Sequence, residues 1–156
     1  AISDDKVRGM RNFANKLWNI GRFIELSFQL SALSSQPILV YDEKMHKKLK
    51  NPNDKRIISE VNMLVAGVTR DMERYRFSDA SQKIYDFAWH TLADVHIEKN
   101  KERFKNGDKQ ALAVLLHVFQ TILKLLHPFM PFVTEEIWKT LSSEEKTPLI
   151  ISRWPG

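Results

Sequence analysis

The stretch NFANKLWNIGRF, residues 12–23, carries an excess of amide, cationic and aromatic side chains. Three of its residues are asparagines, although Asn is a poor helix former because its amide competes for backbone hydrogen bonds. At helical spacing these side chains fall into two neighbouring columns, Asn12, Lys16, Asn19 and Phe23 in one and Arg11, Asn15, Trp18 and Arg22 in the other. Amides hydrogen-bond to base edges, cations hold phosphates, and aromatic rings stack on bases. The pattern therefore predicts a surface that binds unstacked nucleotides.

Some residues of this surface have an alternative role in packing. For Trp18, packing against the rest of the protein is favoured, whereas for Phe23 base stacking and core packing are equally compatible with the sequence. A second surface of similar composition is predicted further along the chain, with His90, Asp94, Ile97 and Lys101 on one stripe and Glu98 and Lys105 on an adjoining one. Taken alone, the second surface is typical of an ordinary charged helix face.

The motifs of an independent active site are absent from the sequence. It has no Gly-rich phosphate loop, no GxSxG and no HExxH, and the lack of Cys excludes disulfides and thiolate metal sites. The five histidines are scattered: His90 and His96 fall on different helix faces, and His117 lies in an apolar run typical of a hydrogen-bonded core histidine. Neighbouring acidic residues lie near predicted helix ends, where the helix dipole explains them. We expect no catalytic residue, metal site or cofactor in this chain.

Apolar spacing predicts long helices that position these surfaces. The first runs from an N-cap at Ser3 to the Ser-rich stretch at 31–37, with a core stripe of Met10, Phe13, Leu17, Ile20, Ile24 and Phe28. A second long helix is predicted to begin at residue 53 or 54, and Gly67 within it would allow a neighbouring helix to pack closely. A third is predicted to run from an N-cap at Ser78 to residues 106–107. The last two are predicted to begin after an N-cap at Asp108 and at Pro131 or Thr134. A short helix is also expected within 38–56. Because the helix after Asp108 is apolar nearly all round, it belongs at the centre of a bundle.

The expected fold is all-α, an up-down bundle of about five helices that forms a single domain over residues 1–156. The net charge is +5 with a pI near 9.5, which agrees with a polyanionic partner without requiring one. A solvated basic loop is the favoured interpretation of the 34–56 connector with Lys44, Lys47, Lys48 and Lys50, and contact of these lysines with a bound nucleic-acid loop is the alternative. With no Cys, no signal peptide and apolar stretches shorter than a membrane span, a cytoplasmic protein that does not contact membranes is expected. The start at Ala1 and the end at RWPG suggest a piece of a longer chain.

Three stretches together resemble the anticodon-binding domain of class I aminoacyl-tRNA synthetases. They are NFANKLWNIGRF, FSDASQKIYDFAW with DVHIEKNK, and LLHPFMPFVTEEIW, and they occur in the family's order over nearly the whole chain. NKLWN followed by RF resembles the valyl type more than the isoleucyl and leucyl types. In such enzymes a separate catalytic domain uses ATP and Mg²⁺ to charge tRNA, and the helical bundle grips the anticodon loop. The resemblance thus implies a parent valine–tRNA ligase of protein biosynthesis, monomeric, whose catalytic domain precedes this bundle.

The resemblance also implies roles for individual residues. Valine anticodons share a middle A and a third C, which the bundle helps to read in the family. Phe23 is expected to stack on an anticodon base, with Asn19 and Arg22 contacting base or phosphate. The remaining expected contacts are Ile97 and Glu98 on the other side of the base pocket, Lys101 near the backbone, and Asn15 and Lys16 in support.

Other parts of the resemblance carry no expected RNA contact, or depart from the family. In LHPFMPFVTEEIW, a bend at residues 127–131 is expected to dock the last helices, with Trp138 packed beneath. Many bacterial members have Trp-Tyr where this chain has Val95-His96. The HIGH and KMSKS motifs of the catalytic domain are absent, and EKMHKK at 43–48 lacks the Ser of the latter. The first hypothesis is therefore an anticodon-binding module of the valyl type, or else of the isoleucyl or leucyl type. The second is a free-standing helical module that binds a protein. The third and weakest is an enzyme in its own right.

Overall fold

The computed structural model describes residues 4–32, 39–141, 149 and 152–156. Within these residues the chain forms seven α-helices and one π-helix, with no strand. They are α1 (Asp4–Ala32), α2 (Glu43–Lys48), α3 (Pro52–Glu73), α4 (Phe77–Asp86), the π-helix η1 (Phe87–Ile97), α5 (Lys101–Lys105), α6 (Lys109–Leu126) and α7 (Pro131–Leu141). The predicted all-α bundle is confirmed, and the short helix expected within 38–56 is α2.

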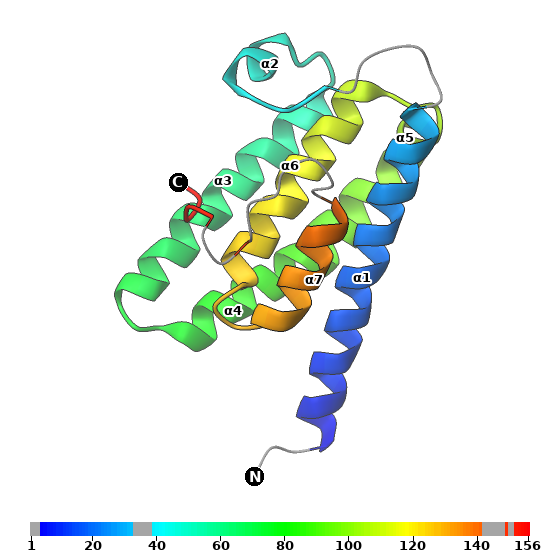
Figure 1. The fold of residues 1–156 in the computed structure, drawn as a ribbon. Coiled ribbons are helices and arrows are strands. Elements are labelled where there is room, and N and C mark those ends of the chain that lie inside the picture. The colour runs from blue at the N-terminus through cyan, green and yellow to red at the C-terminus, as the bar shows by residue number, and fades with distance from the viewer. Residues whose placement is uncertain (1–3, 33–38, 142–148, 150–151) are drawn as a thin grey trace.

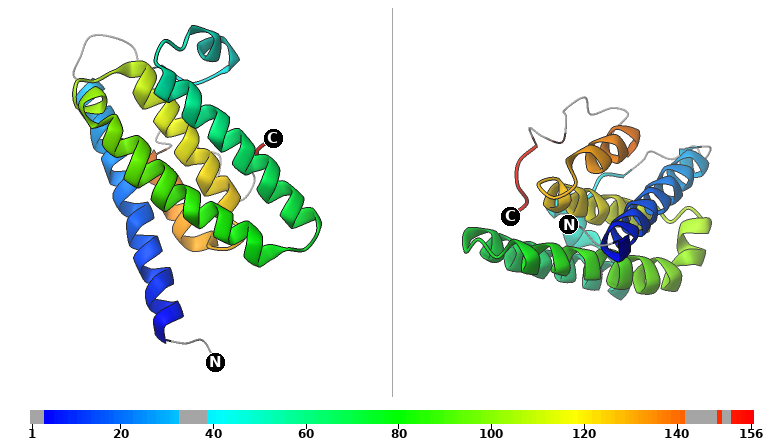
Figure 2. Two further views of the ribbon diagram at one scale, coloured as in Figure 1. Left: turned by 180° about the vertical axis from the view of Figure 1, so that it is seen from behind. Right: turned by 90° about the horizontal axis from the view of Figure 1, so that it is seen from below.

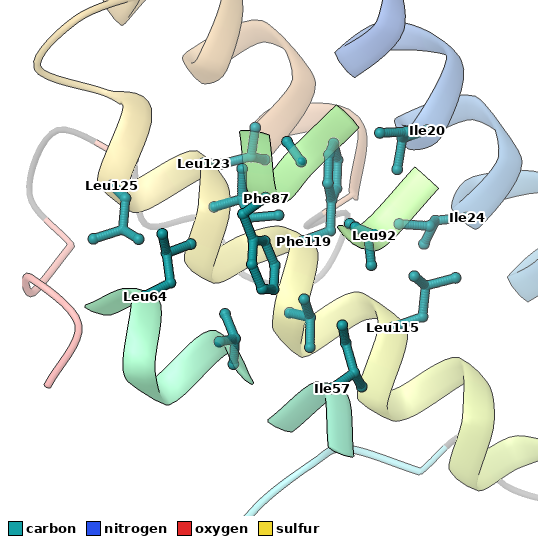
Figure 3. Close-up of a cluster of buried hydrophobic side chains, with 14 of the residues drawn as sticks. Ile20, Ile24, Ile57, Leu64, Phe87, Leu92, Leu115, Phe119, Leu123 and Leu125 are labelled. Carbon is teal, nitrogen blue, oxygen red and sulfur yellow. The ribbon is translucent and has the colours of Figure 1, made fainter. Parts of the chain in front are cut away.

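Helix α6 forms the centre of the bundle, as its nearly continuous apolar sequence predicts. It contacts α1, α3, α4, α5 and α7. Its side chains interlock with those of α1, α3 and η1 around Phe119, Leu115 and Leu123 (Figure 3). By length and composition α6 could also cross a membrane, but 67% of it is buried inside the protein, so its apolar character is explained by the core.

Helix α1 packs on the bundle through most of the predicted stripe. Phe13, Leu17, Ile20 and Ile24 are buried. Met10 was predicted in the core, and this is wrong: it is 53% exposed, because the first turns of α1 project beyond the other helices (Figure 1). The binding surface predicted on α1 therefore begins where the helix meets the bundle.

The segment predicted as one helix from 78 to 106 is divided into α4, η1 and α5. The predicted cap is wrong, since α4 begins at Phe77 with Arg76 at its N-cap and no side-chain cap hydrogen bond. The helical path breaks at Asn100, which is 1% exposed and donates its amide Nδ2–H to the carbonyl of His96 at 2.8 Å. The predicted stop is confirmed by Gly107, whose φ of +74° closes the turn after α5.

The starts of the remaining helices follow their capping residues. Helix α3 begins at Pro52, one residue before the predicted start, because the side chain of Asn51 accepts a hydrogen bond from the backbone N–H of Asn53. Asp108 caps α6 by accepting from the backbone N–H of Ala111 at 3.0 Å, as predicted. Helices α1, η1 with α5, and α3 then lie on one side of α6, as the left view of Figure 2 shows. This side carries both surfaces that the sequence singles out.

Candidate nucleic-acid interface

Asn15, Asn19 and Arg22, which we call the outer column of α1, come from both predicted columns and face solvent. Together with half-buried Trp18, they line a shallow depression on the helix. Their spacing of three and four residues puts them on one stripe, opposite the buried Phe13–Leu17 face. The structure thus brings together two amides, a guanidinium and part of an indole, which suit base edges, phosphate and stacking.

Phe23 lies at the edge of the core and not wholly within it. It is half-buried, and its ring meets the ring of Phe104 in an edge-to-face contact with centroids 5.7 Å apart. Phe104 of α5 is 3% exposed and lies 6.2 Å from the ring of His96. Phe23 is therefore anchored by packing on Phe104, and part of its side chain stays accessible to solvent. Both roles that the sequence left open are compatible with this placement.

Lys16 is held between α1 and η1. Its Nζ lies 3.9 Å from the carboxylate of Asp94 and 5.4 Å from the centre of the Trp89 ring. The same carboxylate contacts Nδ1 of His90 at 3.3 Å. These contacts link α1 to η1, and the role of Lys16 in RNA binding stays a prediction.

The three RNA contacts expected on the second surface, Ile97, Glu98 and Lys101, occupy different environments. Ile97 is 8% exposed and belongs to the core. Glu98 and Lys101 are exposed and paired with each other at 3.3 Å. The structure brings Lys101 to the same side of the bundle as the column of α1, while Ile97 supports this side from beneath.

A buried ion pair that the sequence did not indicate fixes α5. Arg103 donates two hydrogen bonds to the carboxylate of Asp54, at 2.9 and 2.7 Å, and a third to Asp108 at 3.0 Å. Asp54 is fully buried, and the hydrogen bond to it raises the pKa of Arg103. Asn100 joins the network by accepting from Arg103 and from Asn53. The network ties α5 to α3 and to the cap of α6, so it holds Phe104 in place beneath Phe23.

The surroundings of two histidines, buried His96 and half-buried His117, favour the neutral form. Burial lowers the pKa of His96 to about 4, and its Nε2 has no hydrogen-bond partner among the described residues. Burial, and then the charge of Lys124, lowers the pKa of His117 to about 4. His117 was predicted in the core, and it lies half-buried beneath the ring of Tyr41 with centroids 4.4 Å apart. Val95 beside His96 is exposed, so the Val95-His96 pair presents only its first side chain to solvent.

The region of LHPFMPFVTEEIW packs internally. The ring of His127 hydrogen-bonds to the hydroxyl of Thr134 at 3.0 Å across the bend between α6 and α7. Trp138 is 4% exposed, which confirms its predicted place beneath the last helices. Within the described residues no group of three or more His, Asp or Glu side chains is placed to hold a metal ion.

The bundle and its surface define a class of protein. Residues 54–156 match the family described as the anticodon-binding domain of tRNA ligase. The match covers more than half of the chain, and the chain belongs to this family. Helix α1, with most of the predicted contacts, lies outside the matched residues.

Relatives of the chain that cover α1 as well include valine–tRNA ligases. The chain is 38% identical over 149 residues to the valine–tRNA ligase of Petrotoga mobilis, 39% over 163 residues to the chloroplastic/mitochondrial valine–tRNA ligase 2 of Arabidopsis thaliana, and 36% over 158 residues to that of Clostridium tetani. These matches include 93–99% of the chain but only 16–17% of each relative. The chain thus corresponds to about one sixth of such an enzyme.

Proposed function

We propose that this chain recognises the anticodon loop of tRNA(Val) as the anticodon-binding domain of a valine–tRNA ligase. The observation that carries the proposal is the exposed column of Asn15, Asn19 and Arg22 beside the anchored ring of Phe23. The family membership and the valine–tRNA ligase relatives support it. The parent enzyme, monomeric and cytoplasmic, supplies the ATP- and Mg²⁺-dependent charging from its catalytic domain.

The proposed recognition divides the work among side chains of different chemistry. The amide of Asn19 offers a donor and an acceptor to a Watson–Crick edge, which an unstacked loop base exposes. The guanidinium of Arg22 contacts a phosphate or the plane of a base. Phe23 receives a base on its open side, a contact worth about 1–3 kcal/mol. Because its other side rests on Phe104, little conformational entropy is lost when the base binds.

An NMR titration with a valine anticodon stem-loop tests the proposal. We expect shifts in the amide resonances of residues 15–23 and 98–105, with no comparable change along α7. Shifts confined to other elements would show that these residues do not contact the RNA. A titration with a matched stem-loop carrying an isoleucine or leucine anticodon separates the valyl type from the other two. Absence of any RNA-dependent shift would favour a protein-interaction module.

A further inference from the structure

The positive charge of the chain is concentrated in two segments. Residues 42–56 contain six basic residues (Lys or Arg) and three acidic ones (Asp or Glu). Residues 98–109 contain five basic residues and three acidic ones. The rest of the chain has thirteen basic and thirteen acidic residues, so these 27 residues account for the entire net charge of +5. The two segments meet in space, because α2, the start of α3, α5 and the start of α6 all lie at the same end of the bundle (Figure 1). We call residues 42–56 and 98–109 the basic end.

Four of the six acidic residues of the basic end are engaged within the protein. Asp54 is buried against Arg103, and Asp108 both contacts Arg103 and caps α6. Asp42 caps α2 by accepting from the backbone N–H of Met45 at 2.7 Å, and Glu98 pairs with Lys101. The exposed cations therefore outnumber the two remaining acids, Glu43 and Glu102, which also face solvent. The exposed cations include Lys44, Lys47, Lys48, Lys50, Lys55, Arg56, Lys99 and Lys105.

The lysines of α2 stand on a fixed platform, in contrast to the solvated loop that the sequence suggested. Met45 and Leu49 are buried against the bundle. The side chain of Gln110 in α6 donates to the carbonyl of Lys48 at 3.1 Å and accepts from the N–H of Lys50 at 3.4 Å. Contacts of this kind keep the exposed face of α2 in one orientation. A fixed row of cations binds a polyanion with less loss of conformational entropy than a mobile loop does.

We propose that the basic end binds the phosphate backbone of the same RNA whose loop is held by α1 and α5. The inference rests on the proposed function and extends it to a second surface. The two surfaces are continuous, since α5 carries Phe104, which contacts Phe23, and Lys101 and Lys105, which belong to the basic end. Phosphate contacts position an RNA without reading its sequence. The basic end thus provides affinity, and the column of α1 provides base discrimination.

Salt dependence of stem-loop binding tests this division. In the variant Lys44→Gln/Lys47→Gln/Lys48→Gln, three exposed charges of α2 are removed. The control, Arg70→Gln/Arg74→Gln/Arg76→Gln, removes three exposed charges at the opposite end of α3, so both variants have a net charge of +2. Affinity for a valine anticodon stem-loop is measured by titration between 50 and 200 mM salt. Each lost phosphate contact reduces the log–log salt slope by about 0.7–0.9.

We expect the α2 variant to lose about 2 from the slope and to bind about tenfold more weakly at low salt, with the control close to the unmodified chain. Its preference for the valine stem-loop over one with a changed anticodon should be unaltered. Equal slopes for the two variants would overturn the inference. So would a loss of binding to anionic phospholipid vesicles with no change in the RNA slope, because that result assigns the surface to a membrane.

The proposed function and this inference fail in different ways. If the unmodified chain does not distinguish anticodon sequences but the α2 variant still lowers the slope, base reading is wrong and backbone binding stands. If anticodon sequences are distinguished and the α2 variant behaves as the control does, backbone binding at α2 is wrong and base reading stands. Thermal unfolding followed by circular dichroism checks that both variants are folded.

Discussion

Phe23 is both packed and partly accessible, which explains why its sequence context alone could not decide between core packing and base stacking. Its edge packs on Phe104 while the residue remains half-exposed. Periodicity identifies the face of a helix on which a residue lies, but a residue at the border of that face can be anchored on one side and open on the other. The identity of its neighbour depends on α5, which is eighty residues further along the chain.

The first prediction concerns Phe23 itself. Phe23→Ala should reduce the free energy of unfolding by about 1–2 kcal/mol, less than a fully buried Phe, because only one side of the ring is packed. It should also weaken stem-loop binding about tenfold, since one stacked base contributes about 1–3 kcal/mol. Urea unfolding and RNA titration measure the two effects. Phe104→Leu is the matched control: it should lower stability while leaving the affinity of the folded protein within about twofold, a factor worth less than 0.5 kcal/mol. If Phe23→Ala binds RNA as tightly as the unmodified chain, Phe23 does not stack on a base and its role is only structural.

The second prediction concerns pH. His96 and His117 have pKa values lowered to about 4, so in the folded state they stay neutral while the unfolded chain takes up protons below the usual 6.5. Their contribution to stability is therefore complete above pH 6.5 and is lost as the pH falls towards 4. Between pH 7 and 5.5 the free energy of unfolding should fall by about 1 kcal/mol for each histidine. Urea unfolding of His117→Gln across this range should show a shallower dependence, and an unchanged slope would contradict the account.

At the scale of elements, the apolar period predicted where the helices lie, whereas the capping residues predicted their starts only in part. Asp108 caps α6 as predicted, whereas Ser78 does not cap α4. The division at Asn100 was not predictable, because the residues that cause it meet only in the folded protein. Asp54 and Arg103 are 49 positions apart, and a pattern of apolar residues gives no sign of a buried ion pair. The same network determines where Phe104 meets Phe23.

The third prediction tests that network. Arg103→Met leaves the carboxylate of fully buried Asp54 without its partner and should cost about 3–5 kcal/mol of stability. The double variant Asp54→Asn/Arg103→Met should be more stable than Arg103→Met alone, because no unpaired charge then stays buried. Urea unfolding of both variants measures the difference. If the double variant is the less stable one, the ion pair is not what holds α5 to α3.

The fourth prediction compares two helical glycines. A Cβ at Gly21 would lie 3.1 Å from Cγ2 of Ile137, which is fully buried, so Gly21→Ala should destabilise the contact of α1 with α7 by about 1–3 kcal/mol. A Cβ at Gly67 would meet the side chain of Lys83 at an ordinary 3.7 Å, so Gly67→Ala should stabilise α3 by about 0.5–1 kcal/mol. Thermal unfolding measures both effects. If both variants shift the unfolding temperature in the same direction, close packing of α1 and α7 does not require Gly21.

At the scale of the whole molecule, the position of the charge matters more than its total. A net charge of +5 in the sequence was compatible with many partners. The fold brings residues 42–56 and 98–109 to one end, where the entire excess meets the side that carries Phe23. The contacts of Asn15, Asn19, Arg22, Ile97, Glu98 and Lys101 with RNA stay predictions, because they depend on a partner that the chain alone does not contain.

The central claim is that the outer column of α1 reads the anticodon. Affinities for two stem-loops that differ only in the middle anticodon base, A or G, test it most directly, in the unmodified chain and in Asn19→Ala/Arg22→Gln. We expect the unmodified chain to prefer A about tenfold, the factor that one base contact of about 1.4 kcal/mol provides. The variant should lose this preference without loss of thermal stability, since both residues are exposed. An unmodified chain that binds the two equally, or a variant that keeps the preference, would contradict the account.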